Sequence, residues 1–190
     1  MDYERLHAIA EELANHAPDT VRGYEIADQG IVMMAPPSRP HEFNAFVIRQ
    51  QLDRAIEPGL VAHTGGEVEE AAIGRLRRPD VIVIPFEAFS ARIMSAFSPA
   101  DVACVVEIVS PTNHTTDYID KVRDYAAMGI DPYLVIDPRT STVTVFTDPS
   151  FGESEPTYRG RHDYAFGDKV AVGTWTLDTS ELQSYPVPTE

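Results

Sequence analysis

Apolar positions recur along this chain with two different periods, and each period predicts a different kind of element. Residues 3–15 repeat apolar side chains at the spacing of an amphipathic helix. Residues 81–84 and 133–137 are short, almost wholly apolar runs, typical of strands buried on both faces. The same criteria predict helices over 41–56 and 115–128, single helical turns over 88–93 and 179–183, and strands over 20–27, 31–35, 60–70, 101–109, 142–147 and 170–177.

Polar and turn-forming residues separate these elements. Asp28-Gln29-Gly30 lies between two short strands and is typical of a hairpin turn. Gly65-Gly66 interrupts the strand over 60–70, and Gly129 is placed to end the helix over 115–128. Residues 148–168 are polar and turn-rich, so we predict no regular element there. The order of elements predicts an α/β fold with a mixed central β-sheet flanked by helices.

Length and composition agree with one globular domain. The chain has 190 residues, of which 43% are hydrophobic and 24% charged. We therefore expect residues 1–190 to form a single domain whose C-terminus frays over 184–190. No run approaches the roughly 20 apolar residues of a membrane helix, and the acidic N-terminus is unlike a signal peptide. With a lone cysteine, Cys104, beside a buried strand, we expect a core residue and a cytoplasmic protein.

The charge is strongly acidic, with a formal net value of −15. This opposes non-specific attraction to nucleic acid, which depends on phosphate neutralisation, although a local basic patch is compatible with it. The chain has only two lysines, Lys121 and Lys169. The first of these follows the most apolar strand, which directs attention to that part of the sequence.

Two carboxylates are associated with the buried strands. Glu107 lies inside the apolar run 105–109, and Asp80 directly precedes the run 81–84. A carboxylate in such a strand is costly unless a metal, a cation or a proton accompanies it. If the strands are neighbours, both carboxylates and the main-chain carbonyl of Ile108 can meet one Mg²⁺, which prefers oxygen ligands. The alternative is a purely structural role, with each carboxylate held by an arginine or by backbone amides.

Lys121 is expected on the helix that follows the Glu107 strand. It shares a helix face with Asp117 and lies near Asp124, so a surface ion pair is the simpler interpretation. The functional interpretation is a cation that orients the attacking water and offsets charge on a phosphate. Glu67 alternates with Glu69 on a predicted strand and is either a third metal ligand or part of a solvated face.

Other kinds of site find little support. His41 begins a predicted helix, and the remaining histidines are scattered, with no HExxH motif and no Cys/His cluster that would indicate structural zinc. The chain has no phosphate-binding loop and no dinucleotide fingerprint. Ser110 lacks the surrounding glycines of a serine hydrolase elbow.

Several short motifs, taken together, resemble the Uma family of restriction endonuclease domains over about residues 20–180. The stretch from Glu107 to Pro138 carries the most specific part of this resemblance. The motifs are Tyr24-Glu25-Ile26, Gly30, Met34-Ala35-Pro36-Pro37-Ser38, His41, Arg78-Pro79-Asp80-Val81, Val106-Glu107-Ile108-Val109-Ser110-Pro111, Asp117, Lys121, Tyr125, Gly129-Ile130 and Tyr133-Leu134-Val135-Ile136-Asp137-Pro138.

The resemblance extends to the PD-(D/E)XK nuclease superfamily and implies a restriction-endonuclease-like fold with a Mg²⁺-dependent site. It identifies Asp80 and Glu107 as the two acidic motifs. The superfamily lysine is missing, because Val109 occupies its position, and Lys121 matches a lysine displaced onto the following helix. Asp117 matches a family position too. Glu25 and His41 also match, as residues that border the site.

These inferences lead to two hypotheses. The first is an endonuclease that hydrolyses phosphodiesters, with DNA as substrate, Mg²⁺ or Mn²⁺ as cofactor, and Asp80, Glu107 and Lys121 as catalytic residues. The alternative is an inactive nuclease-fold domain that binds a partner or senses nucleic acid. We further expect a homodimer that pairs through an exposed edge at 142–147. A basic groove beside Glu107 would favour the nuclease, and its expected members are Arg39, Arg49, Arg75, Arg77, Arg78 and Arg123.

Overall fold

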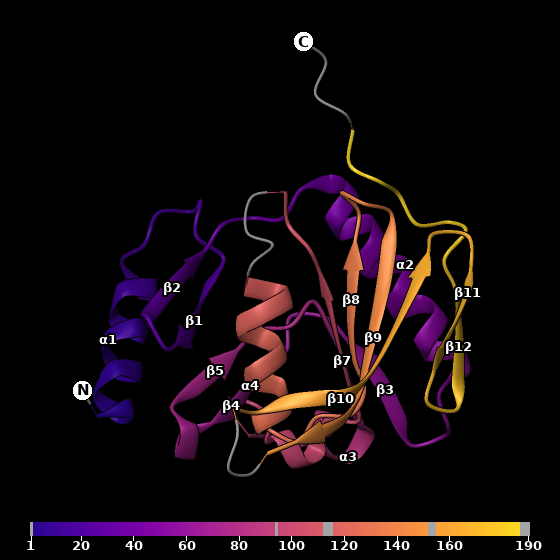
Figure 1. Cartoon of the computed structure of the whole chain (residues 1–190). Coiled ribbons are helices and arrows are strands. Elements are labelled where there is room, and N and C mark those ends of the chain that lie inside the picture. The colour runs from indigo at the N-terminus through magenta and orange to yellow at the C-terminus, as the bar shows by residue number, and fades with distance from the viewer. Residues whose placement is uncertain (1, 94, 112–115, 152–154, 187–190) are drawn as a thin grey trace.

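Two β-sheets of different size organise the fold (Figure 1). The computed structural model describes residues 2–93, 95–111, 116–151 and 155–186. In chain order, the helices and strands are α1 (Tyr3–Asn15), β1 (Gly23–Ala27), β2 (Gly30–Met34), α2 (Arg39–Ala55), β3 (Leu60–His63), β4 (Val68–Glu70), β5 (Arg75–Arg77), β6 (Val81–Pro85), α3 (Phe86–Ser90), β7 (Cys104–Ile108), α4 (Lys121–Ala127), β8 (Tyr133–Asp137), β9 (Thr142–Ser150), β10 (Thr157–Ala165), β11 (Lys169–Val172) and β12 (Trp175–Asp178).

The larger sheet has six strands in the order β10-β9-β8-β7-β6-β3. Only β7 and β8 run parallel, and the other neighbours are antiparallel. Side chains alternate between the faces, so Val81 and Val83 pack on the α2 side while Ile82 and Ile84 pack on the α4 side. Helices thus cover both faces, which confirms the predicted α/β fold with a mixed central sheet.

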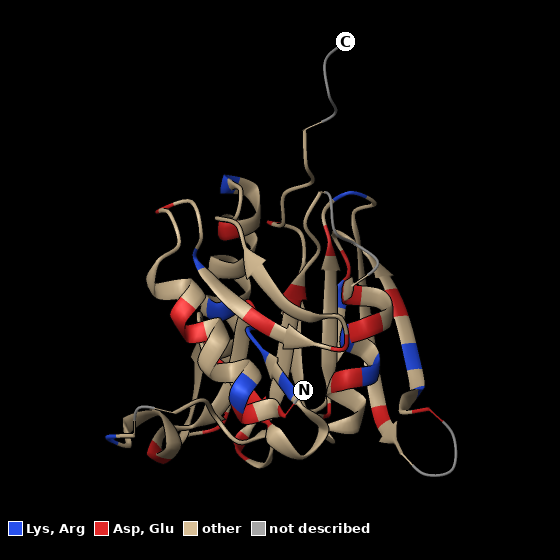
Figure 2. Ribbon diagram, turned by 90° about the vertical axis from the view of Figure 1, so that its left-hand side faces the viewer, with Lys and Arg blue, Asp and Glu red and all other residues tan. Residues whose placement is uncertain are grey.

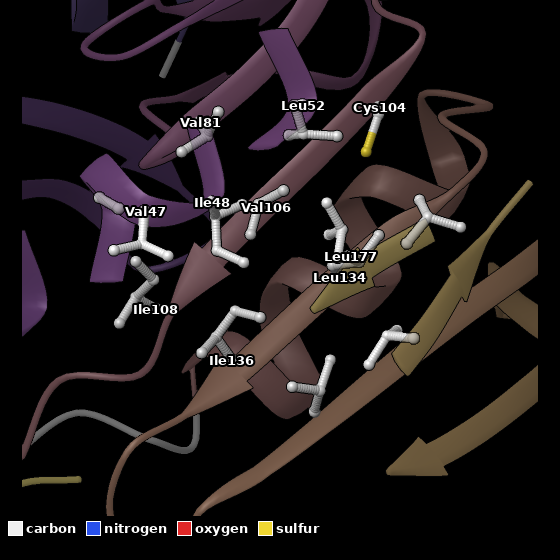
Figure 3. Packing of buried hydrophobic residues seen from close by; sticks show 14 of the residues in the cluster. Val47, Ile48, Leu52, Val81, Cys104, Val106, Ile108, Leu134, Ile136 and Leu177 are labelled. Carbon is white, nitrogen blue, oxygen red and sulfur yellow. The ribbon is translucent and has the colours of Figure 1, made fainter. Parts of the chain in front are cut away.

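The core on the α2 side is shown in Figure 3. Ile48 and Leu52 of α2 are fully buried and belong to one cluster with side chains of β6, β7 and β8. Leu177 of the β11–β12 hairpin joins the same cluster. Cys104 is a free, fully buried thiol in this core, as the sequence predicted.

The smaller sheet has four strands in the order β2-β1-β5-β4 and packs against α1. The predicted strand over 60–70 is divided between the two sheets, since β3 belongs to the large sheet and β4 to the small one. Gly65 between them has a φ of +76°, a left-handed conformation that glycine adopts without strain. The short strand β5 was not predicted.

Two expectations for the C-terminal half were wrong. Residues 148–168 are not irregular, because β9 continues to Ser150 and β10 occupies Thr157–Ala165. Most side chains of β10 are exposed, so the strand lacks the apolar alternation on which the prediction relied. The segment 142–147 is not an edge either, because β9 pairs with β8 on one side and β10 on the other.

Smaller differences concern element boundaries. The predicted helix over 115–128 comprises a π-helical turn, Thr116–Asp120, followed by α4, and its first residue lies outside the described part. The strand over 101–109 is shortened to β7, the helical turn over 88–93 shifts back to α3, and 170–177 forms the β11–β12 hairpin. No helix forms over 179–183. Of the predicted fraying over 184–190, residues 187–190 lie outside the described part. No helix among the described residues is long and apolar enough to cross a bilayer.

Candidate functional site

Glu107 points toward α4 because of the alternation along β7. Its neighbours Val106 and Ile108 pack in the α2-side core, so the side chain between them projects from the opposite face. Glu107 is only 2% exposed. The Lys121 ammonium lies 2.8 Å from Glu107 Oε1, and the Tyr125 hydroxyl donates a hydrogen bond of 2.6 Å to the same oxygen. The buried carboxylate is therefore paired with a cation and a hydroxyl donor.

Lys121 is the first residue of α4 and lies among three carboxylates. Besides Glu107, its Nζ is 3.2 Å from Asp117 Oδ1 and 3.5 Å from Glu25 Oε1. Asp117 comes from the preceding π-helical turn and Glu25 from β1 of the small sheet. The side chain is 7% exposed, so this is a buried cluster and not the surface ion pair that helix spacing alone suggested.

Glu25 connects this cluster to a second buried cation, Arg77. The Arg77 Nη1 donates to Glu25 Oε2 at 2.8 Å, and the backbone amide of Arg78 donates to Glu25 Oε1 at 3.1 Å. Arg77 Nε also donates to Asp124 Oδ2 at 3.0 Å. The expected proximity of Asp124 to Lys121 does not become a contact, because Asp124 faces β5, where it binds Arg77 and Arg75.

Asp80 lies at the more open end of the site. The register pairs Val81 with Val106 across β6 and β7, which continues to Asp80 beside Glu107. The backbone amide of Ile108 donates to Asp80 Oδ2 at 2.7 Å, and His41 Nε2 is 3.2 Å from the same oxygen. The Asp80 side chain is 21% exposed, against 3% for Glu107. Asp80 is thus the acidic group of the site that solvent reaches most easily.

His41 approaches Asp80 from the first turn of α2. Burial alone would lower its pKa, but the hydrogen bond to Asp80 and the nearby Ile108 carbonyl raise it above its ordinary value. Its other ring nitrogen, Nδ1, is buried without a hydrogen-bond partner among the described residues. His41 therefore lies beside Asp80 and the backbone of Ile108.

Burial and crowding shift the ionisation of the cluster. Burial raises the pKa of Glu107 to about 8; Lys121 opposes this rise, and the carboxylates of Asp80, Asp117 and Glu25 add to it. Burial also raises the pKa of Asp117 against the effect of Lys121. For Lys121 itself, burial would lower the pKa, but the carboxylates raise it well above its ordinary value. Burial would raise the pKa of Glu25, but the neighbouring cations, Lys121 first, hold it below the ordinary value.

The donor set suits a hard divalent cation, although no cage is preformed. The described residues contain no group of three or more His, Cys, Asp or Glu side chains arranged to hold a metal ion. Asp80, Glu107 and the Ile108 carbonyl nevertheless offer oxygen ligands. When all its groups are ionised, the cluster has more carboxylates than cations: Glu25, Asp80, Glu107 and Asp117 against Lys121 and the Arg77 that Glu25 shares with Asp124.

Two expectations at the rim differ from the structure. Glu67 contacts Arg78 at 3.6 Å and, among the described residues, does not contact the Lys121 cluster, so the structure does not bring it to the other candidate ligands. The basic groove that would favour a nuclease is not formed, because five of its six arginines bind carboxylates. In Figure 2, blue segments are interspersed with red ones on this side of the molecule. The paired arginines are Arg49, Arg75, Arg77, Arg78 and Arg123.

A family model described as "Putative restriction endonuclease", Uma2, matches residues 10–175. The chain belongs to the Uma2 family. A crystal structure of "a putative nuclease belonging to DUF820" from Anabaena variabilis ATCC 29413 has a similar fold, with a TM-score of 0.65 and 15% sequence identity. The alignment covers 90% of this chain and 95% of that one. No curated protein matches in sequence.

In this Uma2 domain, two residues that bind carboxylates of the site were not predicted from the sequence. Tyr125 was named only as a residue matching the family motifs, yet its hydroxyl binds Glu107. The available signal was its spacing of four residues from Lys121, which places both on one helix face. Arg77 was expected in a surface groove, and no local pattern indicated that it would be buried against Glu25.

Proposed function

We propose that this chain is a metal-dependent nuclease that hydrolyses phosphodiester bonds, with DNA as substrate. The observation that carries this proposal is the buried contact of 2.8 Å between Lys121 and Glu107, with Asp80 on the adjacent strand. Membership of a family described as "Putative restriction endonuclease" and the fold shared with "a putative nuclease" from Anabaena variabilis support it.

Asp80, Glu107 and the Ile108 carbonyl would hold Mg²⁺ or Mn²⁺. Such an ion, when bound, lowers the pKa of a coordinated water and stabilises charge on the phosphate. The protein fixes the orientation of Glu107 by binding its Oε1 twice, through Lys121 and Tyr125. It fixes Asp80 through the Ile108 amide. Both carboxylates are therefore held in place by donors of the protein itself.

Lys121 supplies the positive charge nearest the carboxylates. Its raised pKa keeps the ammonium protonated over the working pH range, so it can position the attacking water or a phosphate oxygen and offset developing negative charge. Asp117 and Glu25 hold the ammonium at 3.2 and 3.5 Å and limit its rotamers. This assigns the displaced lysine a catalytic role and its two further partners a positioning role.

A cleavage panel tests the proposal. Plasmid DNA, single-stranded DNA and RNA are incubated with Mg²⁺ or Mn²⁺ and wild type, Glu107→Gln or the matched control Glu67→Gln, a carboxylate outside the cluster. We expect cleavage by wild type and Glu67→Gln and none by Glu107→Gln. Calorimetry should show divalent-ion binding that is lost in Glu107→Gln. Wild type that binds neither ion would contradict the metal site.

A second candidate is a nuclease-fold domain that binds a partner or senses nucleic acid without cleaving it. The pairing of Arg75, Arg77 and Arg123 with carboxylates favours it, because those side chains cannot also neutralise a DNA backbone. The cleavage panel separates the candidates. Binding of a nucleic acid or a protein by wild type and Glu107→Gln alike, with no cleavage under any condition, would favour the second.

A further inference from the structure

The edges of the two larger sheets differ in how they are protected. An edge strand exposes unpaired backbone N–H and C=O groups, which a strand from another chain can bind. The six-stranded sheet ends in β10 and β3, and the four-stranded sheet ends in β4 and β2. Three of these edges are blocked or charged, and β2 is neither.

Side chains or backbone cover two of the edges. On β3, the outward amide of Ala62 donates to Asp53 Oδ1 at 3.1 Å, and its carbonyl accepts from Arg49 Nε at 3.1 Å. On β4, the amide of Glu69 donates to the carbonyl of Phe97 at 3.0 Å. These groups are therefore unavailable to a second chain.

The third edge, β10, is protected by charge. Arg159, Arg161 and Asp163 project from it with side-chain exposures of 68%, 57% and 56%. Charged side chains along an edge disfavour pairing with another strand, because the pairing would desolvate them.

Strand β2 has none of these protections. Its five residues, Gly30-Ile31-Val32-Met33-Met34, include no charge and no proline. The Arg22 amide donates to the Met34 carbonyl, so Met34 faces the β1 side. Backbone groups alternate in direction along a strand, so those of Ile31 and Met33 point outward. No hydrogen bond to either backbone is found among the described residues.

The helix α1 leaves this edge open. Its buried residue Ala10 packs on Tyr24, Ile26 and Leu76, which belong to β1 and β5. Further along, the Tyr3 hydroxyl donates to Glu69 of β4 at 2.7 Å. The helix packs on one face of the sheet, where Ile31 of β2 joins the same cluster, but it makes no hydrogen bond to β2 among the described residues, and Met33 remains 37% exposed.

We propose that β2 pairs antiparallel with β2 of a second copy of this chain. The edge is self-complementary: with Val32 on the two-fold axis, the outward backbone of Ile31 meets the partner's Met33, and that of Met33 meets the partner's Ile31. The outward backbone N–H and C=O groups of Ile31 and Met33 are then all paired, and the new contact buries no charged side chain of β2. The two four-stranded sheets become one continuous sheet of eight strands.

The pairing has a consequence for the candidate site. Glu25 on β1 lies directly opposite Val32 in the register. Because the two-fold axis is perpendicular to the joined sheet, both copies of Glu25 lie on the same face. Three strand spacings separate them, roughly 14 Å. A dimer formed in this way presents two candidate sites on one side.

A strand of five residues buries less than the roughly 800 Å² per partner of a standard interface, so the dimer should dissociate on dilution.

Sedimentation of the full chain over a dilution series tests the pairing. Wild type should pass from dimer to monomer. Met33→Lys places a charge on the edge, and Met33→Pro removes an outward N–H without breaking the pairing with β1, so both should stay monomeric while retaining the far-UV circular dichroism of wild type. A wild type that is monomeric at every concentration, or a Met33→Lys variant that dimerises like wild type, would overturn the proposal.

A cysteine at the two-fold axis tests the register independently. Residues directly opposite each other at a non-hydrogen-bonded position are close enough for a disulfide. Since Cys104 is buried, Val32→Cys supplies the accessible thiol and should cross-link into a dimer under mild oxidation. The control is Arg159→Cys on the β10 edge, whose side chain is 68% exposed and should cross-link much more slowly. Equal rates for the two variants would overturn the proposed register.

Discussion

Two buried cations bind the same carboxylate, but the other carboxylates around them differ in number and arrangement. Arg77 and Lys121 are 1% and 5% exposed, and each binds one oxygen of Glu25. Arg77 completes its contacts with Asp124, so two carboxylates share one planar guanidinium in fixed geometry. Lys121 instead faces Glu107 and Asp117 as well, three carboxylates around one ammonium.

The two cations differ in how closely the charges around them are balanced. Around Arg77, the second arginine Arg75 also binds Asp124, and the local charges are close to balanced. Around Lys121, burial first and the neighbouring carboxylates second raise the pKa of Glu107 against the effect of the ammonium, and groups with such shifted pKa values are common at functional sites. An added cation would relieve this excess of carboxylates. We therefore expect Arg77 to contribute mainly to stability and Lys121, under the proposed function, mainly to cleavage.

The largest effect is expected for Arg77→Met. The change leaves Glu25 and Asp124 buried without their shared cation, and breaking such a pair costs about 3–5 kcal/mol. Urea denaturation measures the loss of unfolding free energy. The control Arg159→Met removes an exposed arginine 3.6 Å from Asp148 and should change it by less than about 1 kcal/mol. Similar losses in both variants would contradict a structural role for Arg77.

Lys121→Met should act on cleavage more than on stability. Loss of a charge that stabilises the transition state lowers the rate by about 10²–10³-fold. The destabilisation should be smaller than for Arg77→Met, because Glu107 and Asp117, whose pKa values are raised, can take up protons. Lys169→Met is the matched control, since the chain has only these two lysines. Equal cleavage by both variants in the panel would rule out the catalytic role of Lys121.

The raised pKa of Glu107 should make the free energy of unfolding depend on pH. The pKa of Glu107 rises from 4.5 to about 8 on folding. Between these values the folded protein holds a proton that the unfolded chain has lost, so this group's contribution to stability falls as the pH rises. The slope is at most about 1.4 kcal/mol per pH unit. Urea titrations from about pH 5 to 8 should give a shallower decline for Glu107→Gln than for wild type, and parallel curves would contradict the shift.

The smallest effect is expected for Glu67→Gln. Glu67 contacts only the partly exposed Arg78, at 3.6 Å, among the ion pairs of the described residues. We expect a change in stability of less than about 0.5 kcal/mol and unchanged divalent-ion affinity by calorimetry. A clear loss of ion affinity would restore Glu67 as a third ligand and extend the site toward β4.

Short-range sequence patterns predicted the part of the site that is built from adjacent strands and the helix that follows them. Asp80 and Glu107 meet because two short apolar runs form adjacent strands, and Lys121 reaches Glu107 because its helix follows that strand. Such patterns did not predict that Glu25 would bind Arg77 and Lys121 at once. This arrangement depends on how a second sheet packs against α4, which no short-range spacing encodes.

The same limit explains the errors in the fold. The core strands β6, β7 and β8 follow from continuous apolar runs, since burial on both faces demands them. Strand β10 depends on backbone pairing with β9 and keeps most of its side chains in water, so its sequence has little apolar signal. The predicted edge at 142–147 was wrong because β10 was missing from the prediction.

The double attachment of Glu25 also has a dynamic consequence. One carboxylate joins β1 of the small sheet to α4, which packs on the large one. A ligand that draws Lys121 away from Glu25 weakens that connection, and the small sheet should then open more often. Amide hydrogen exchange along 24–26 would then accelerate. Slow exchange in β1 thus becomes a reporter of what happens at Lys121.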